Sequence, residues 1–163
     1  MGIANPVTRR AAGSRYHEEL SRQIADFLVS TQGSSASMIP VTDLFCLYNR
    51  ARGTALISPD DLLEACRLFE RLNLAFRLRK FDSGVLVVQS ASYSDAAMSA
   101  QLLEMLSSSG DSGAFLTAMD VAEQHGVSLP LAMEHLQTAE KLEKLCRDET
   151  PNGVRFYPNL YLM

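Results

Sequence analysis

The sequence lacks the features of membrane-spanning, secreted and disulfide-bonded proteins. Its 163 residues contain no basic N-terminal region followed by an apolar stretch, as a secretory signal would. No apolar run approaches the roughly 18 to 20 residues of a transmembrane helix. Three cysteines, Cys46, Cys66 and Cys146, form an odd and widely spaced set. We therefore expect buried, reduced thiols, no disulfide framework and a cytosolic compartment.

Residue patterns of metal sites, nucleotide sites and catalytic centres are also missing. His17, His125 and His135 are far apart, and neither a His-x-x-x-His nor a Cys-x-x-Cys spacing occurs. No Gly-rich loop joins a strand to a helix. The adjacent carboxylates Asp60 and Asp61 diverge on a helix, where they are typical first-turn charges rather than a proton-sharing pair. The sequence thus predicts no catalytic residue, no cofactor and no metal.

The stretch 58–90 has the pattern of the last part of a winged helix. Ser58 is a typical helix cap and Pro59 suits the first helical position, after which apolar residues recur at helical spacing as far as Leu72. The period then changes. Along residues 76–81 the set Phe76, Leu78 and Lys80 alternates with Arg77, Arg79 and Phe81, as side chains on the two faces of a strand do. Residues 85–88 are β-branched and apolar, so two strands are predicted around the turn at 82–84.

Two further helices are predicted before this stretch. The first covers 15–31 and is closed by the Gly/Ser-rich loop 32–35. The second is short, with Thr42 as its potential cap and Gly53 at its end. Residues 2–14 contain Asn-Pro and Gly without helical periodicity, and we expect an extended lead-in there.

The same order of elements recurs in the second half of the chain. Helices are predicted from Ser94 to about residue 106, over 119–124 and over 128–142, followed by strands over 145–149 and 154–157. Ser58 aligns with Ser128, and Gly84 with Gly153. Residue identity between the two halves is low, so what repeats is the pattern of elements.

We therefore predict an α+β, mostly helical chain of two tandem winged-helix domains packed against each other. The expected divisions are a linker end over 1–14, a first domain over 15–91 and a second over 92–163. Each domain alone has only a small core, so a shared interface would bury more apolar surface than either unit could.

Charge does not favour binding to nucleic acid. The 15 basic and 19 acidic residues give a formal net charge of −4, and both predicted third helices mix carboxylates with their basic residues. The basic cluster Arg77, Arg79 and Lys80 sits on a predicted strand instead. A winged-helix nucleic-acid-binding module that uses this strand as its wing is the alternative function.

The C-terminal run 155–163 is strongly apolar for a chain end, so we expect something to cover it. Either Phe156 and Leu160 return to the second domain's own core, or the run contacts a partner, with Tyr157 and Tyr161 as aromatic anchors. The exposed side of the first helix is a further candidate contact. The candidate interface residues of the C-terminal run are Arg155, Phe156, Tyr157, Leu160 and Tyr161.

A series of segments in order along the chain carries a family resemblance: GIANPVTR at 2–9, YHEEL at 16–20, LYNRARG at 47–53, LISPDDL at 56–62, FDSGV at 81–85, LCRDE at 145–149 and GVRFYPNL at 153–160. Together they resemble the C-terminal half of the ESCRT-II subunit family called vacuolar protein sorting thirty-six, which bears a GLUE domain. The resemblance covers essentially the whole chain.

The resemblance implies a non-catalytic scaffold that sorts ubiquitinated membrane proteins into multivesicular bodies. The implied partners are the other large winged-helix ESCRT-II subunit and the small ESCRT-II subunit, in a hetero-oligomer with indirect links to ESCRT-I and ESCRT-III. In this family a Pro-rich N-terminal motif of the small subunit attaches to the second winged helix of its host. No direct contact with nucleic acid is implied, and the implied location is the cytoplasm with recruitment to endosome membranes.

The family's N-terminal GLUE domain, which binds phosphoinositide and ubiquitin, has no counterpart in these 163 residues. We therefore expect the chain to be a fragment, with membrane contact only through the missing domain. Lipid binding and ubiquitin binding are assigned to no residue present.

Overall fold

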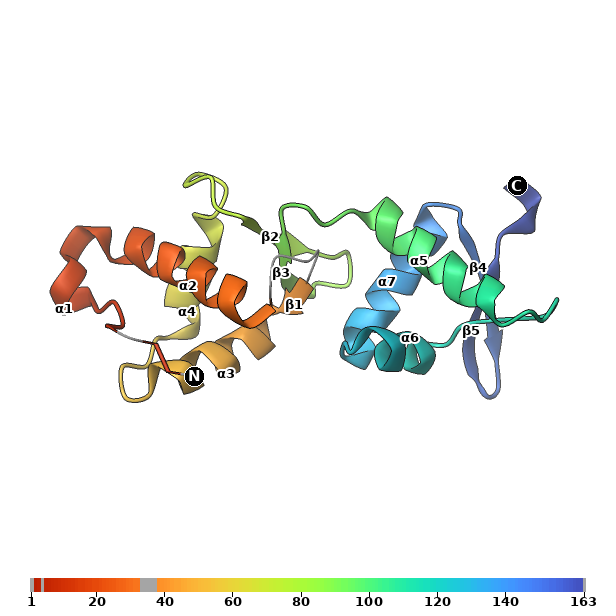
Figure 1. Ribbon diagram of the computed structural model, residues 1–163, viewed down its shortest axis with the longest axis horizontal. Coiled ribbons are helices and arrows are strands. Elements are labelled where there is room, and N and C mark those ends of the chain that lie inside the picture. The colour runs from red at the N-terminus through yellow and green to blue at the C-terminus, as the bar shows by residue number, and fades with distance from the viewer. Residues whose placement is uncertain (1, 4, 33–37, 163) are drawn as a thin grey trace. The chain divides into compact units, whose positions relative to one another are not determined.

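The computed structural model describes residues 2–3, 5–32 and 38–162 and divides the chain into two compact units (Figure 1). The units are Met1–Tyr93 and Ser94–Met163, and each is described by itself. Both combine helices with a small antiparallel sheet, as the α+β prediction required. Gly33, Ser34 and Ser35 of the predicted loop lie outside the described residues.

The first unit has the helix, helix, helix and hairpin order of a winged helix, with three short additions, α1, a 3-10 turn and β1. Its sheet is antiparallel in the order β1-β3-β2, and Leu78 of β2 lies opposite Val88 of β3. The elements are α1 Arg9–Ala12, a 3-10 turn Gly13–Arg15, α2 Tyr16–Gln32, β1 Met38–Pro40, α3 Val41–Arg52, α4 Pro59–Arg67, β2 Phe76–Lys80 and β3 Leu86–Ser90.

Helix α4 begins where the sequence predicts and ends earlier. The Ser58 hydroxyl oxygen accepts a hydrogen bond from the Asp61 amide at 3.1 Å, and Pro59 opens the helix. The predicted extension to Leu72 is wrong. After Arg67 the chain tightens into turns in which the Phe69 amide bonds the Cys66 carbonyl, three residues back, at 3.2 Å. This tighter turn still places Phe69 in the core, which is why its spacing looked helical.

Helix α3 starts without the predicted Thr42 cap. It follows directly on β1, whose last residue, Pro40, pairs with Val87 of β3 and occupies the cap position without a side-chain hydrogen bond. Strand β1 was not predicted, because three residues are too few to display alternation. Gly53 ends the helix with φ of 68°, a backbone conformation that glycine adopts readily.

The lead-in 2–14 is not extended throughout. Residues Arg9–Ala12 form helix α1, which a periodicity argument misses because it spans barely one turn. Ile3 and Val7 pack against the core of the first unit. This segment is therefore bound to the unit through its own side chains.

The second unit repeats the order of the first. Helices α5 and α7 start next to the predicted residues Ser94 and Ser128, and the side chains of Ser94, Thr117 and Ser128 accept hydrogen bonds from the first turns of α5, α6 and α7. The elements are α5 Asp95–Ser108, α6 Ala118–His125, α7 Leu129–Lys141, β4 Leu145–Thr150, β5 Gly153–Pro158 and a 3-10 turn Leu160–Leu162.

Each unit has its own hydrophobic core. Fully buried side chains of the first include Leu20, Ile24, Leu44, Tyr48, Leu62 and Phe69, and those of the second include Leu102, Leu136, Leu145 and Phe156. These residues come from the predicted apolar faces of the helices and from the inward positions of the hairpins. The predicted packing of the two domains against each other stays a prediction.

The cysteines differ in burial. Cys66 lies in the core of the first unit, and burial raises the pKa of its thiol to about 12. Cys146 in β4 is half-buried. Cys46 on α3 is exposed, which corrects the prediction of three buried thiols: it falls on the outward face of an amphipathic helix.

Candidate protein-binding surface

Phe156, a predicted interface residue, belongs to the core of the second unit. Its side chain is fully buried, and its amide and carbonyl pair with the carbonyl and amide of Leu116 at 2.9 and 2.8 Å. The Arg147 guanidinium lies over the Phe156 ring, 5.8 Å from the centroid. Phe156 therefore belongs to the core of the second unit rather than to a partner contact. Its side chain is not on the surface, so we remove it from the candidate interface.

The two neighbours of Phe156 point the other way, because side chains alternate along a strand. Arg155 and Tyr157 are half-buried and meet Phe115, which precedes the Leu116 bridge. The Arg155 guanidinium carbon lies 4.4 Å from the Phe115 ring centroid, and the Phe115 and Tyr157 rings are 5.7 Å apart at 50°. We call these three residues the aromatic–arginine cluster.

Sequence reasoning identified two members of this cluster and missed Phe115. The sequence gives little indication of a surface role for Phe115, because this residue lies in a short predicted connection between two helices. Its neighbour Leu116 is buried, so alternation within an extended connection could have suggested an outward Phe115. The side chain is 38% exposed.

The C-terminal turn displays the remaining two candidate residues. Leu160 is 69% exposed and Tyr161 is 95% exposed, so Leu160 does not return to the core. The backbone before them is fixed: the Asn159 amide donates to the Lys144 carbonyl and the Asn159 side chain to the Glu143 carbonyl, both at 2.9 Å. Large apolar side chains are thus held in solvent on an anchored backbone.

Leu160 also forms part of an open groove of about 370 Å³ beside α5. Apolar side chains line the groove, and the carboxylates of Glu104 and Asp111 also border it. The apolar lining residues are Leu103, Leu106, Ala114, Pro158 and Leu160. An apolar floor with a polar rim is the usual composition of a surface that binds another protein.

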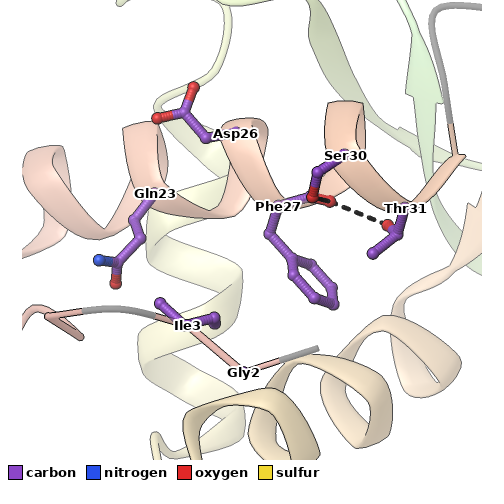
Figure 2. Close-up of a pocket in the computed structure, with 7 residues that line it drawn as sticks. All are labelled: Gly2, Ile3, Gln23, Asp26, Phe27, Ser30 and Thr31. Carbon is purple, nitrogen blue, oxygen red and sulfur yellow. Dashed lines mark hydrogen bonds between the residues drawn. The ribbon is translucent and has the colours of Figure 1, made fainter.

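A second groove lies beside α2, at its half-buried residues Gln23 and Phe27, and contact through the exposed side of this helix stays a prediction. Figure 2 shows Gln23 and Phe27 directed from α2 toward Gly2 and Ile3, while Asp26 points away. The groove measures about 370 Å³, and an adjoining groove of about 320 Å³ shares Phe27 and continues to Leu47 and Ala51 of α3.

Three basic side chains of the first unit, Arg71, Arg77 and Arg79, have partners within the unit. Arg71 pairs with Glu18 at 2.9 Å, and Arg77 lies 3.8 Å from Glu70. Arg79 stacks on the Phe81 ring, 4.5 Å from its centroid. Cations already paired with carboxylates contribute little to phosphate binding, which weakens the nucleic-acid alternative.

Within residues 2–3, 5–32 and 38–162, no group of three or more His, Cys, Asp or Glu side chains is placed to hold a metal ion. Over the same residues, no helix combines the length and the apolar character that crossing a membrane demands.

A solved structure of the ESCRT-II endosomal trafficking complex contains a chain with the same fold. The TM-score is 0.69 at 24% sequence identity, and the match covers 93% of this chain and 95% of that chain. The likeness therefore extends over both units.

Sequence comparison connects the chain to named relatives. Vacuolar protein-sorting-associated protein 36 from Danio rerio is 48% identical over 163 residues, which are 99% of this chain and 42% of the relative. The protein of that name from Homo sapiens is 45% identical over 164 residues, with 99% and 42% covered. The chain thus spans less than half the length of these curated relatives. The model of the EAP30/Vps36 family matches residues 1–149, and the chain belongs to that family.

Proposed function

We propose that the chain is a non-catalytic scaffold of the ESCRT-II complex, which sorts ubiquitinated membrane proteins into multivesicular bodies. It acts through protein contacts of its two winged helices, in the cytoplasm and on endosome membranes. The observation that carries the proposal is the display of Leu160 and Tyr161 on an anchored backbone, in a chain 45% identical to a vacuolar protein-sorting-associated protein.

The proposed partners are the other large winged-helix ESCRT-II subunit and the small ESCRT-II subunit. The aromatic–arginine cluster and the groove beside α5 support contact with the small subunit. Pro-rich segments dock on surfaces lined by aromatic side chains, because a polyproline helix loses little conformational entropy on binding. Phe115 and Tyr157 present such rings, and Pro158 and Leu160 continue the surface along the chain.

A rigid adaptor is the proposed mechanism. The surface residues sit on a strand and on a hydrogen-bonded turn, so little backbone freedom is lost when a partner binds. Two domains that each hold a partner would place those partners at a defined separation and favour further assembly. The winged-helix nucleic-acid module has less support, because Arg71, Arg77 and Arg79 have partners within the first unit.

The test is the mass in solution of this chain, alone and mixed with its two sister subunits, by light scattering after size exclusion. The proposal predicts a stable complex with one copy of the large partner and two of the small one. If the chain eluted alone in every mixture, the scaffold function would be refuted.

A further inference from the structure

The N-terminal segment of the first unit is bound to all three of its main helices. We call residues 2–9 the strap, of which 2–3 and 5–9 are described. The Ile3 amide donates to the Ala51 carbonyl of α3 at 3.0 Å, and Arg9 pairs with Asp61 of α4. Gln23 of α2 and Arg52 of α3 bind the backbone between these two ends. A mere linker would not have contacts this specific.

Gln23 recognises the strap backbone with both ends of its amide. Its nitrogen donates to the Asn5 carbonyl at 3.0 Å, and its oxygen accepts from the Val7 amide at 3.0 Å. Pro6, between them, has no N–H to satisfy. The Gln23 amide thus bonds the backbone on both sides of Pro6, which suits a peptide with proline in the middle.

Arg52 completes the recognition from α3. It is only 6% exposed, and its described acceptors are all uncharged. They are the carbonyls of Val7 and Ala55, the side-chain oxygen of Gln23 at 3.2 Å and the hydroxyl of Tyr48 at 3.4 Å. A buried cation is costly unless its N–H groups have acceptors. The Val7 carbonyl, supplied by the strap, is therefore part of what makes a buried Arg52 tolerable.

At the other end of the strap, Arg9 meets a carboxylate that is already held in place. Asp61 is 8% exposed and lies 3.1 Å from the His17 imidazole nitrogen. The Arg9 guanidinium also lies over the Tyr16 ring, 5.2 Å from the centroid. A basic residue two positions after Val7 thus has both an ion-pair partner and an aromatic surface.

The strap conformation is selected by these contacts rather than by its own preference. Asn5 has φ of 53°, a left-handed conformation that asparagine adopts more often than most other non-glycine residues but that a following proline disfavours. A free peptide would rarely adopt it.

We propose that the first unit contains a binding site for an Asn-Pro-Val-x-Arg peptide, filled in this chain by its own strap. Gln23, Arg52 and Asp61 are its recognition residues, one from each of α2, α3 and α4. The inference goes beyond the scaffold function, for which the proposed contact with the small subunit lies on the second unit. The site contacts the backbone of the strap and the side chain of one arginine. It should therefore bind a separate peptide of the same sequence.

The test uses the full chain with residues 2–9 replaced by a Gly/Ser sequence of equal length. A labelled peptide of sequence IANPVTRR, residues 3–10, is titrated and its fluorescence anisotropy measured. The peptide should bind the strap-replaced chain at least tenfold more tightly than the wild-type chain, where the tethered strap competes at an effective concentration on the order of millimolar. A peptide of the same residues in scrambled order should not bind.

Gln23→Ala in the strap-replaced chain should weaken peptide binding at least tenfold. Asp26→Ala is the matched control on the same helix, since this side chain points away from the strap in Figure 2, and it should leave binding unchanged. A folded strap-replaced chain that binds the two peptides equally would overturn the proposal.

If the strap-replaced chain does not fold, hydrogen exchange of the wild-type chain tests whether the strap occupies the proposed site. The amides of Ile3 and Val7 both donate hydrogen bonds and should exchange at least tenfold more slowly than in the free peptide. Exchange of both at the rate of the free peptide would refute the site.

Discussion

The guanidinium of Arg155 lies over the ring of Phe115, with its central carbon 4.4 Å from the ring centroid. This contact joins β5 to the connection that precedes α6, alongside the backbone bridge between Leu116 and Phe156. One strand therefore contributes a core residue inward and a surface cluster outward.

Removal of the Arg155 cation should cost about 0.5 to 1 kcal/mol of stability, the range for a cation–π contact at a solvent-accessible site. Urea unfolding of Arg155→Ala measures it. Arg155→Lys is the control, because an ammonium retains the charge over the Phe115 ring. If both variants lost the same free energy, the stacking of the planar guanidinium would matter rather than its charge.

Phe156→Ala should destabilise the second unit by about 3 to 5 kcal/mol, because the ring is fully buried and its loss leaves a cavity. Leu160→Ala, two residues beyond the strand end, should change the free energy of unfolding by less than about 0.5 kcal/mol, because the side chain is 69% exposed. Circular dichroism during urea unfolding compares the two. Equal losses would mean that Leu160 is a core residue.

Acid should destabilise the first unit through Asp61. Burial alone would raise the pKa of this carboxyl, but hydrogen bonds from Arg9 and His17 outweigh burial and hold the pKa below its ordinary value. A depressed pKa means that the folded state binds the proton less well than the unfolded state. The contribution is thus fully present above the unfolded pKa of about 3.9 and is lost as pH falls through the lower folded value.

The measurement is the free energy of unfolding of the first unit between about pH 2 and pH 6, for wild type and for Asp61→Asn. The variant should show a shallower decline on acidification. A variant whose decline runs parallel to that of the wild type would show that other carboxyls determine the acid sensitivity.

The caps of the third helices should contribute equally in the two units. Ser58 and Ser128 both accept a hydrogen bond from the amide three residues on, at 3.1 and 3.4 Å. Ser58→Ala and Ser128→Ala should each cost about 1 kcal/mol, and the corresponding Asp variants should retain most of it. Thermal unfolding monitored by circular dichroism ranks the four variants. An Asp variant as unstable as its Ala counterpart would argue against capping as the cause.

Most of the fold could be predicted because its signals are local. Hydroxyl caps at Ser58, Ser94 and Ser128, and the turn at Gly84, mark element boundaries with a backbone reason for each residue type. Helical spacing then identified the buried faces of α2 and α5.

The elements that were missed depend on tertiary contacts. Strand β1 exists because Ile39 pairs with Val88 of β3, and α1 exists beside a strap held by Gln23 and Arg52. Three or four residues carry no measurable periodicity. The early end of α4 has a similar cause, because Phe69 reaches the core equally well from a tight turn.

The candidate surface could be predicted in part. An apolar run at a chain end predicts a covering contact but does not show which side chains turn inward. The alternation of a strand assigns Phe156 to the core and Arg155 and Tyr157 to the surface, once the register with Leu145–Thr150 is known. Phe115 joins them only through the fold.

The most direct test of the scaffold account is the affinity of the small ESCRT-II subunit for the wild-type chain and for a Leu160→Ser, Tyr161→Ala double variant, by isothermal titration calorimetry. Both side chains are exposed, so the variant should keep the wild-type thermal midpoint within about 2 °C. The account predicts at least a tenfold weaker affinity at an unchanged midpoint. Wild-type affinity in the double variant would contradict the account, since the C-terminal surface would then not be where this partner binds.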